Sequence, residues 1–154
     1  RSKSLGELSN EYDVTLRTSI IGPEIGENPK GLFDWFFNQK ERINGYSRAY
    51  WGGVTTLQLA KTIIEAIEQK PVGLYHVTNN EKISKYDLLS LIKYIWNLDQ
   101  IDISDYQQYQ SDKSLVAKKE PFYSRIPPYS EMLCELKEYM LLHKIQYEKY
   151  FSVK

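Results

Sequence analysis

Two segments of the chain have the hydrophobic pattern of buried strands. Residues 14–21 place apolar side chains on both faces of an extended segment, which is typical of a strand covered on both sides. Gly22-Pro23 ends this segment. Residues 73–78 have the same character and predict a second core strand. Residues 46–51 are also expected to be extended, before Gly52-Gly53.

Helical spacing of apolar residues predicts four helices. A short one covers 32–39, and a longer one starts at a capping-box pattern, Thr55-x-x-Gln58, and ends before Pro71. Another starts at Ser84-x-x-Asp87 and runs to about Asn97, and Ser130 is expected to cap the last one. The stripe expected to face the core in the second helix consists of Leu57, Ala60, Ile63, Ile64 and Ile67.

The order of these elements predicts an α/β fold. Residues 3–10 have the character of a helix end, residues 99–128 are polar and irregular, and Ile145, Tyr147 and Tyr150 are packing points in the tail. Two core strands are few for a self-sufficient sheet. We therefore expect an incomplete sheet whose partner strands lie outside these 154 residues or in another chain.

Composition narrows the classes of partner. Twenty Lys and Arg residues balance twenty Asp and Glu residues, so no net field favours nucleic acid. The sequence has no apolar run of about 20 residues, the length that a membrane-spanning helix needs. We expect neither nucleic acid nor membrane as a partner. A single cysteine, Cys134, suits a reducing compartment, and we expect a cytoplasmic location.

The usual signatures of chemistry are missing from the sequence. Neither a Gly-x-Gly-x-x-Gly fingerprint nor a Gly-Lys-Thr/Ser phosphate loop occurs, so no phosphate-cradling loop is expected. His76, Cys134 and His143 lack metal-ligand spacing, and we expect no metal site. His76 is interpreted as a hydrogen-bonded structural residue and Cys134 as a packed thiol.

The start of the chain carries a family resemblance. Lys3 and Gly6-Glu7, followed by residues 16–23, resemble the catalytic helix and next strand of extended short-chain dehydrogenase/reductases. In that family a Tyr-x-x-x-Lys pair is catalytic, and the lysine ammonium lowers the pKa of the tyrosine from about 10. The tyrosine would lie just upstream of Arg1. The 154 residues alone are therefore expected to be inactive.

Three further segments extend the resemblance over nearly the whole chain. They are similar to the dTDP-4-dehydrorhamnose reductase-like branch and comprise residues 44–57, 73–77 and 113–132. The resemblance implies a fragment of an NAD(P)-dependent sugar-nucleotide reductase that acts on a 4-keto sugar for cell-surface polysaccharide precursors. Residues 1–23 would end its Rossmann half, and residues 24–154 would mainly form its substrate-binding portion. NAD(P) would be held by the full-length protein and not by this fragment.

The resemblance also suggests site residues. Lys3 would be catalytic and would contact the cofactor, and Thr18 and Ser19 would line the nicotinamide side of the crevice. Arg48, Tyr50 and Trp51 are the predicted substrate-side residues, with a cation for diphosphate and rings for a base or sugar.

Structural roles remain open for several of these residues. The Tyr50-Trp51 stretch could simply pack against the following helix, and Arg17 could be a structural ion-pair residue. Lys113 and Arg125 are weaker candidates for phosphate contacts, with solvated surface cations as the alternative.

Two other functions remain open at this point. The same family contains sugar-nucleotide epimerases and dehydratases. Alternatively, the chain is a non-enzymatic interaction module that self-associates through its sheet edge and tyrosines. On either interpretation we expect a homo-oligomer, because an incomplete α/β unit exposes apolar surface.

Overall fold

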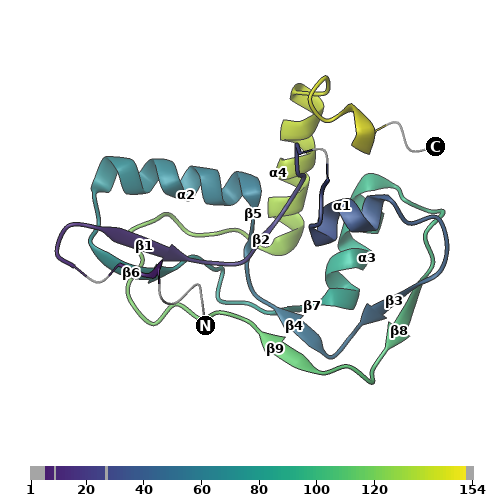
Figure 1. Cartoon of the computed structure of the whole chain (residues 1–154), viewed down its shortest axis with the longest axis horizontal. Coiled ribbons are helices and arrows are strands. Elements are labelled where there is room, and N and C mark those ends of the chain that lie inside the picture. The colour runs from purple at the N-terminus through teal and green to yellow at the C-terminus, as the bar shows by residue number, and fades with distance from the viewer. Residues whose placement is uncertain (1–5, 9, 27, 152–154) are drawn as a thin grey trace.

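The computed structural model describes residues 6–8, 10–26 and 28–151 (Figure 1). Lys3 and half of the predicted helix end over 3–10 lie outside these residues. The elements are, in order, β1 (Val14–Arg17), β2 (Ile20–Ile21), α1 (Leu32–Phe37), β3 (Ile43–Tyr46), β4 (Ala49–Trp51), β5 (Val54–Thr55), α2 (Thr56–Gln69), β6 (Gly73–His76), β7 (Ile83–Ser84), α3 (Lys85–Trp96), β8 (Ile103–Tyr106), β9 (Ser111–Lys113), α4 (Tyr129–Leu142) and the 3-10 helix η2 (Glu148–Tyr150).

The strands form four small sheets in the described part of the chain. β1 and β6 form a parallel pair, as do β2 and β5, and β3 and β8. The fourth sheet has the order β7-β4-β9, with β4 antiparallel to β7 and parallel to β9. The predicted α/β class with an incomplete sheet is therefore confirmed.

The segment predicted as one strand over 14–21 is two strands with different partners. Between them the Thr18 hydroxyl donates to the carbonyl of Val77, at 2.8 Å. The Ser19 carbonyl accepts the Val54 N–H at 2.9 Å, so that β2 aligns with β5 rather than β6. Gly53 permits this approach, because a Cβ there would lie 2.1 Å from the Ser19 oxygen. Residues 46–51 are likewise divided, by a turn between β3 and β4.

The predicted helix starts at Thr55 and Ser84 are confirmed. The Thr55 hydroxyl accepts the Gln58 N–H at 3.2 Å, and the Ser84 hydroxyl accepts the Asp87 N–H at 3.0 Å. The prediction for the last helix is wrong by two residues: its N-cap is Pro128, and Ser130 lies inside the first turn. Proline suits this position because its fixed φ and missing N–H cost little at a helix start.

The core lies where α1, α3 and α4 meet. Phe33, Phe36, Ile92, Met132 and Met140 are each at most 1% exposed. The rings of Phe33 and Phe37 pack edge-on against Trp96, at 5.3 and 5.9 Å between centroids. Both rings also contact Tyr150, which brings η2 onto α1 as the predicted packing point required.

A buried carboxylate reinforces this junction. Asp34 is 2% exposed and accepts the Tyr150 hydroxyl at 2.5 Å and the Lys149 ammonium at 2.8 Å. The Glu24 N–H donates to its other oxygen at 2.9 Å. The three donors compensate the loss of hydration of the charge, which is otherwise costly in an interior.

Helix α2 does not bury the face that the sequence pattern predicted. Ile63, Ile64 and Ile67 are 43, 57 and 68% exposed, and Ala60 is also exposed. The side chains that α2 buries are Gln58, Thr62 and Ala66. Their small or hydrogen-bonded side chains allow close packing; the Thr62 hydroxyl, for instance, donates to the Gln58 carbonyl. The expectation for this stripe was therefore wrong for all its members except Leu57, which packs at the edge of the core.

Three further expectations differ from the structure. Residues 99–128 contain β8 and β9, which the sequence pattern did not indicate. Cys134 is exposed on α4 and is not the packed thiol expected. Ile145 is 95% exposed, so it is not a packing point.

Among the described residues, no helix is long and apolar enough to span a bilayer.

Candidate functional site

The predicted substrate-side residues lie on and beside β4. Tyr50 and Trp51 are neighbours on this strand, so their side chains point to opposite faces of the sheet. Trp51 packs against the core and contacts the Tyr129 ring at 5.8 Å between centroids. The sequence analysis left open a packing role for Trp51 against the helix that follows it. The structure shows such a packing contact, but with α4 and not with α2. The role of Trp51 in binding stays a prediction.

Tyr50 lies under a cation that sequence reasoning missed. The Lys82 ammonium sits 4.4 Å from the centre of the Tyr50 ring and 3.3 Å from the Asp112 carboxylate. The register of the sheet explains the grouping, because Tyr50 is paired with Ser84 of β7 on one side and Asp112 of β9 on the other. The Ser114 hydroxyl and N–H hold the pKa of Asp112 below its usual range, so this carboxylate keeps its charge.

Arg48 projects from the turn before β4 and is exposed. Its guanidinium reaches the Gln107 side-chain carbonyl at 3.5 Å. The nearby Asp105 has a lowered pKa, caused mainly by hydrogen bonds from Ser47 and Gln107 and further by the charge of Arg48. Arg48 is thus a solvent-accessible cation with one long hydrogen bond.

A cavity of about 370 Å³ lies between α1, β3 and the start of α3. Its walls carry two aromatic rings and one amine, and are formed by Leu32, Trp35, Ile43, Asn44, Tyr46, Lys85 and Leu89. Trp35 is 42% exposed. The half-buried Lys85 ammonium makes no hydrogen bond or ion pair with any residue in the described part of the chain. This combination suits a planar ring with a negative group beside it.

The cavity and the Tyr50 group are joined through the chain. Lys85 directly follows Ser84, which is opposite Tyr50 in the sheet, and Tyr46 precedes Arg48 by two residues. Arg48, Lys82 and Lys85 therefore lie within a few residues of the paired positions Tyr50 and Ser84. Lys82 and Lys85 lie within two residues of Ser84, the predicted helix cap, and this is the one indication of them in the sequence.

The predicted cofactor-side residues follow β1. Thr18 and Ser19 are half-buried, and the Thr18 hydroxyl is already engaged with the Val77 carbonyl. Arg17 pairs with Glu7 at 2.5 Å. Arg17 therefore forms a structural ion pair, the role that the sequence analysis left open for it. It also donates to His76 Nε2 at 3.2 Å, while His76 Nδ1 bonds to the Val116 carbonyl at 2.9 Å. His76 is thus hydrogen-bonded on both nitrogens, as its interpretation as a structural residue requires.

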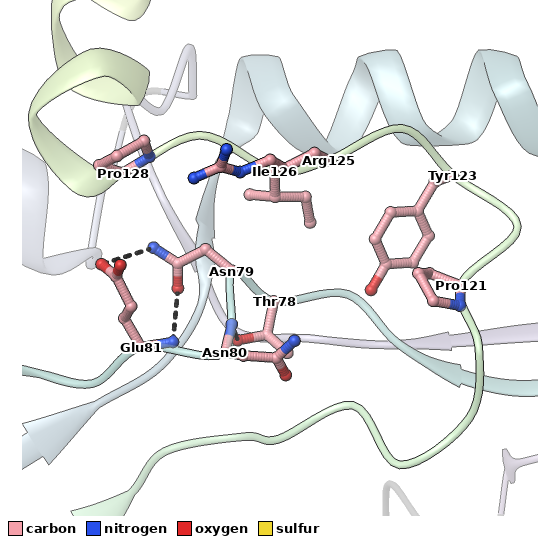
Figure 2. Close-up of a pocket in the computed structure, with 9 residues that line it drawn as sticks. All are labelled: Thr78, Asn79, Asn80, Glu81, Pro121, Tyr123, Arg125, Ile126 and Pro128. Atoms are coloured by element: carbon pink, nitrogen blue, oxygen red, sulfur yellow. Dashed lines mark hydrogen bonds between the residues drawn. The ribbon is translucent and has the colours of Figure 1, made fainter.

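A second cavity, of about 340 Å³, opens at the carboxyl end of β6 (Figure 2). Asn80 links two loops by accepting the Ala117 N–H at 2.7 Å, and Asn79 accepts the Glu81 N–H within its own loop at 3.1 Å. Arg125 lines this cavity and makes no polar contact with any described residue. Lys113 is exposed on β9 in register with Trp51. Both cations agree with the alternative of solvated surface residues, and a phosphate role for either stays a prediction.

Within the described part of the chain, no group of three or more His, Cys, Asp or Glu side chains is arranged to hold a metal ion. The site groups described above are the cations Arg48, Lys82 and Lys85, the two rings of the cavity and Tyr50. Such groups bind and orient an anionic ligand with a planar ring. They do not by themselves supply an acid, a base or a nucleophile.

No protein-family model and no curated protein sequence matches the chain. Several solved structures have a similar fold. A dTDP-4-dehydrorhamnose reductase from Bacillus anthracis in complex with NADP matches with a TM-score of 0.62 and 16% identity, over 90% of this chain and 51% of that one. A UDP-N-acetylglucosamine 4-epimerase from Methanobrevibacter ruminantium in complex with UDP-N-acetylmuramic acid matches at 0.61 and 17%, over 84% and 46%. WbmH of Bordetella bronchiseptica in complex with NAD+ matches at 0.56 and 18%, over 83% and 45%.

These likenesses confirm the predicted α/β fold class and show that the chain shares its fold with part of each of these proteins. The chain spans about half the length of these structures, between 45 and 51%. At 16 to 18% identity the likeness concerns the fold, and activity has to be argued from the site.

Proposed function

We propose that this chain is the nucleotide-sugar-binding part of an NAD(P)-dependent sugar-nucleotide reductase. The observation that carries the proposal is the cavity between Trp35, Tyr46 and Lys85, continuous in the chain with Arg48, Tyr50 and Lys82. A nucleobase would stack in the cavity, and the cations would meet the diphosphate. The similarly folded reductase and epimerase are named for dTDP- and UDP-linked sugars, which have this combination of base and diphosphate.

The residues of this chain do not offer a complete place for the dinucleotide. The sequence lacks a glycine-rich phosphate loop, and the Thr18 hydroxyl is bonded to Val77. Lys3 lies outside the described residues, so its proposed role in catalysis and in cofactor contact rests on the sequence resemblance alone. The proposed contribution of these residues is binding and orientation of the nucleotide sugar.

Epimerisation of a sugar nucleotide is the second candidate. It is favoured by the fold similarity to the 4-epimerase of Methanobrevibacter ruminantium, at a TM-score of 0.61. Both functions require the same nucleotide-binding groups. They differ in the sugar and in the fate of the hydride, which residues outside the cavity would decide.

The test is a calorimetric titration of the 154-residue chain with dTDP and with UDP. We expect binding of at least one of them, and a loss of about tenfold in affinity for Lys85→Gln or Arg48→Gln, because hydrogen bonds to charged groups contribute about 1.5–3 kcal/mol. Trp35→Ala should weaken binding similarly, since base stacking contributes about 1–3 kcal/mol. Tyr94→Ala, on the exposed side of α3, is the control that should bind normally.

Absence of binding by the parent chain, or equal affinity in all variants, would contradict the proposal. Addition of NADH or NADPH with a 4-keto sugar nucleotide should give no turnover by these 154 residues. Robust turnover would show that the chain contains a complete active site, and would refute its assignment as the binding part alone.

A further inference from the structure

Helix α1 is short and forms one wall of the aromatic cavity. It has six residues, and its N-cap, Gly31, supplies no side-chain hydrogen bond. A helix of this length is not stable by itself in water, so contacts with other parts of the chain have to set its place. Leu32 and Trp35 of α1 line the cavity. The contacts that hold α1 therefore also hold this wall.

A group of hydrogen-bonded residues, the Asp34 network, holds another side of α1. It consists of Asp34, Lys149 and Tyr150, and Asp34 directly precedes Trp35 in the helix. The buried Asp34 carboxylate accepts the Tyr150 hydroxyl at 2.5 Å and the Lys149 ammonium at 2.8 Å. Burial and the Asp34 carboxylate raise the pKa of Tyr150, so its hydroxyl keeps its proton and remains a donor.

The network also fixes the loop that leads into α1. The Glu24 N–H donates to the other oxygen of Asp34 at 2.9 Å, and the Glu24 carbonyl accepts the Lys149 ammonium at 2.9 Å. The Glu24 side chain in turn accepts the Lys30 N–H at 2.8 Å. Gly31 fits beside it, because a Cβ there would lie 2.5 Å from Glu24 Oε1. The start of α1 is thus bonded to the same residues as Asp34.

The ring of Tyr150 packs on the buried side of the same helix. Its centroid lies 5.5 Å from that of Phe33 and 5.1 Å from that of Phe37. Trp35, in contrast, is 42% exposed and lines the cavity. Figure 1 shows α1 between η2, which carries Tyr150, and β3, which lines the cavity. One helix therefore connects the η2 contacts to the cavity.

We propose that Tyr150 and Lys149 are positioning residues of the cavity, which act through Asp34 to set the place of Trp35. The inference rests on the proposed function for the ligand, a nucleobase stacked in the cavity. A stacked ring contributes to affinity only when its face meets the base. When Asp34 loses a donor, its buried charge is less well compensated and the carboxylate moves toward water. The short helix turns with it, and Trp35 leaves its place in the wall.

A double-mutant cycle tests whether Tyr150 acts through Trp35. Binding of dTDP and of UDP is measured by calorimetry for the parent chain, Tyr150→Phe, Trp35→Ala and the double variant. Tyr150→Phe should lower the affinity at least about fivefold, because the stacking of the base is partly lost. In the Trp35→Ala background the same change should alter the affinity by less than about twofold, since the ring that it positions is missing. Equal losses in both backgrounds would overturn the inference.

Two control variants separate positioning from general loss of stability. Tyr139→Phe makes the same chemical change at a 38% exposed position of α4. Val77→Ala removes two methyl groups from a fully buried side chain at the end of β6, and should lower the Tm by several degrees, as Tyr150→Phe does. Both controls should bind like the parent chain at a temperature where every variant is folded. A loss in Val77→Ala equal to that in Tyr150→Phe would refute the positioning role.

A second measurement needs no ligand and reports on Trp35 directly. The indole N–H resonance of Trp35 is assigned by NMR with a Trp35→Phe variant, and exchange of the α1 amides is followed in the same samples. Tyr150→Phe and Lys149→Met should each shift this resonance and speed the exchange, by at least about tenfold for Tyr150→Phe. Val77→Ala should leave both unchanged. An unchanged resonance and unchanged exchange in Tyr150→Phe would overturn the inference.

These readouts separate the inference from the proposed function. If the parent chain binds neither dTDP nor UDP but the Trp35 resonance responds to Tyr150→Phe, the network positions Trp35 and the proposed function fails. If the parent chain binds and neither the resonance nor the affinity responds, the proposed function stands and the positioning role is refuted.

Discussion

Helix α2 starts on Thr55 and helix α3 starts on Ser84, and in both the cap hydroxyl accepts the N–H three residues later. Both have apolar residues at helical spacing. In α3 these residues are in the core, with Leu88 at 1% and Ile92 at 0% exposure, whereas in α2 Ile64 and Ile67 are more than half exposed. Local chemistry thus fixes where a helix begins, and the surrounding chain decides which of its faces is buried.

The comparison has a functional side. The start of α3 carries Lys85 into the aromatic cavity, next to the sheet that holds Tyr50. On α2, the buried residues are Gln58, Thr62 and Ala66, and the Glu65 carboxylate accepts the Ser124 N–H. The proposed ligand binding thus falls in the α3 region, whereas α2 presents an exposed apolar face.

The largest difference is expected from truncating one isoleucine in each helix. Ile92→Ala should lower the free energy of unfolding by about 2–5 kcal/mol, because it removes core contacts and leaves a cavity. Ile64→Ala should change it by no more than about 0.5 kcal/mol. Urea unfolding of the 154-residue chain measures both, and a similar loss in the two variants would contradict the assigned surroundings.

The next effect concerns the buried carboxylate of the α1 and α3 region. Tyr150→Phe removes the hydroxyl that donates to Asp34, and should cost about 1.5–3 kcal/mol, the usual contribution of a hydrogen bond to a charged group. Tyr139→Phe makes the same chemical change at a 38% exposed position of α4, and should be nearly neutral. The two free energies come from the same urea series. Equal values would show that the Asp34 network does not stabilise the fold.

Removal of the cap hydroxyl should lower the free energy of unfolding by the same amount in α2 and in α3. Thr55→Ala and Ser84→Ala each remove one acceptor for a first-turn N–H, and each should cost about 1 kcal/mol. Equal losses of stability would show that the two helices have equivalent N-caps and differ only in how their faces are packed. A loss at Ser84 several times that at Thr55 would mean that the cap of α3 acts through the sheet as well.

The smallest effect appears in mild alkali. Burial, followed by the charge of Glu81, raises the pKa of Tyr129 to about 12. A folded-state pKa above the unfolded value of about 10 means that stability is complete below pH 10 and falls as pH rises toward 12. At pH 10.5 Tyr129 should contribute a loss of about 1 kcal/mol, measured by urea unfolding. Tyr129→Phe should reduce the pH dependence by about this amount and leave the rest, because burial also raises the pKa of Tyr123, Tyr147 and Tyr150. A profile that is flat from pH 9 to 11 in the parent chain would refute the assignment.

Much of the fold could be predicted from the sequence, because its signals are local. The caps at Thr55 and Ser84, the aromatic pairs of α1 and the buried residues of α4 all follow from spacing within one or two turns. β8 and β9 were missed because they are short and polar, Ile-Ser-Asp-Tyr and Ser-Asp-Lys. Pairing with strands about 60 residues away holds them extended.

The candidate site was predictable only in part for the same reason. Arg48 and Tyr50 stood out as a cation beside an aromatic residue, but Lys82 and Asp112, which lie beside Tyr50, come from segments that sheet register alone brings together. Lys85 and Trp35 enter the cavity from two helices that are about 50 residues apart in the chain. No spacing rule within the sequence links such residues.

Hydrogen exchange with and without saturating UDP or dTDP tests the central division between the two regions most directly. If the α3 region binds the nucleotide, amides of β3, β4, β7 and the first turn of α3 should exchange more slowly with ligand, while those of α2 at 56–69 should not change. Slower exchange across α2 with none in β3 and β4, or no change anywhere in the chain, would contradict this division.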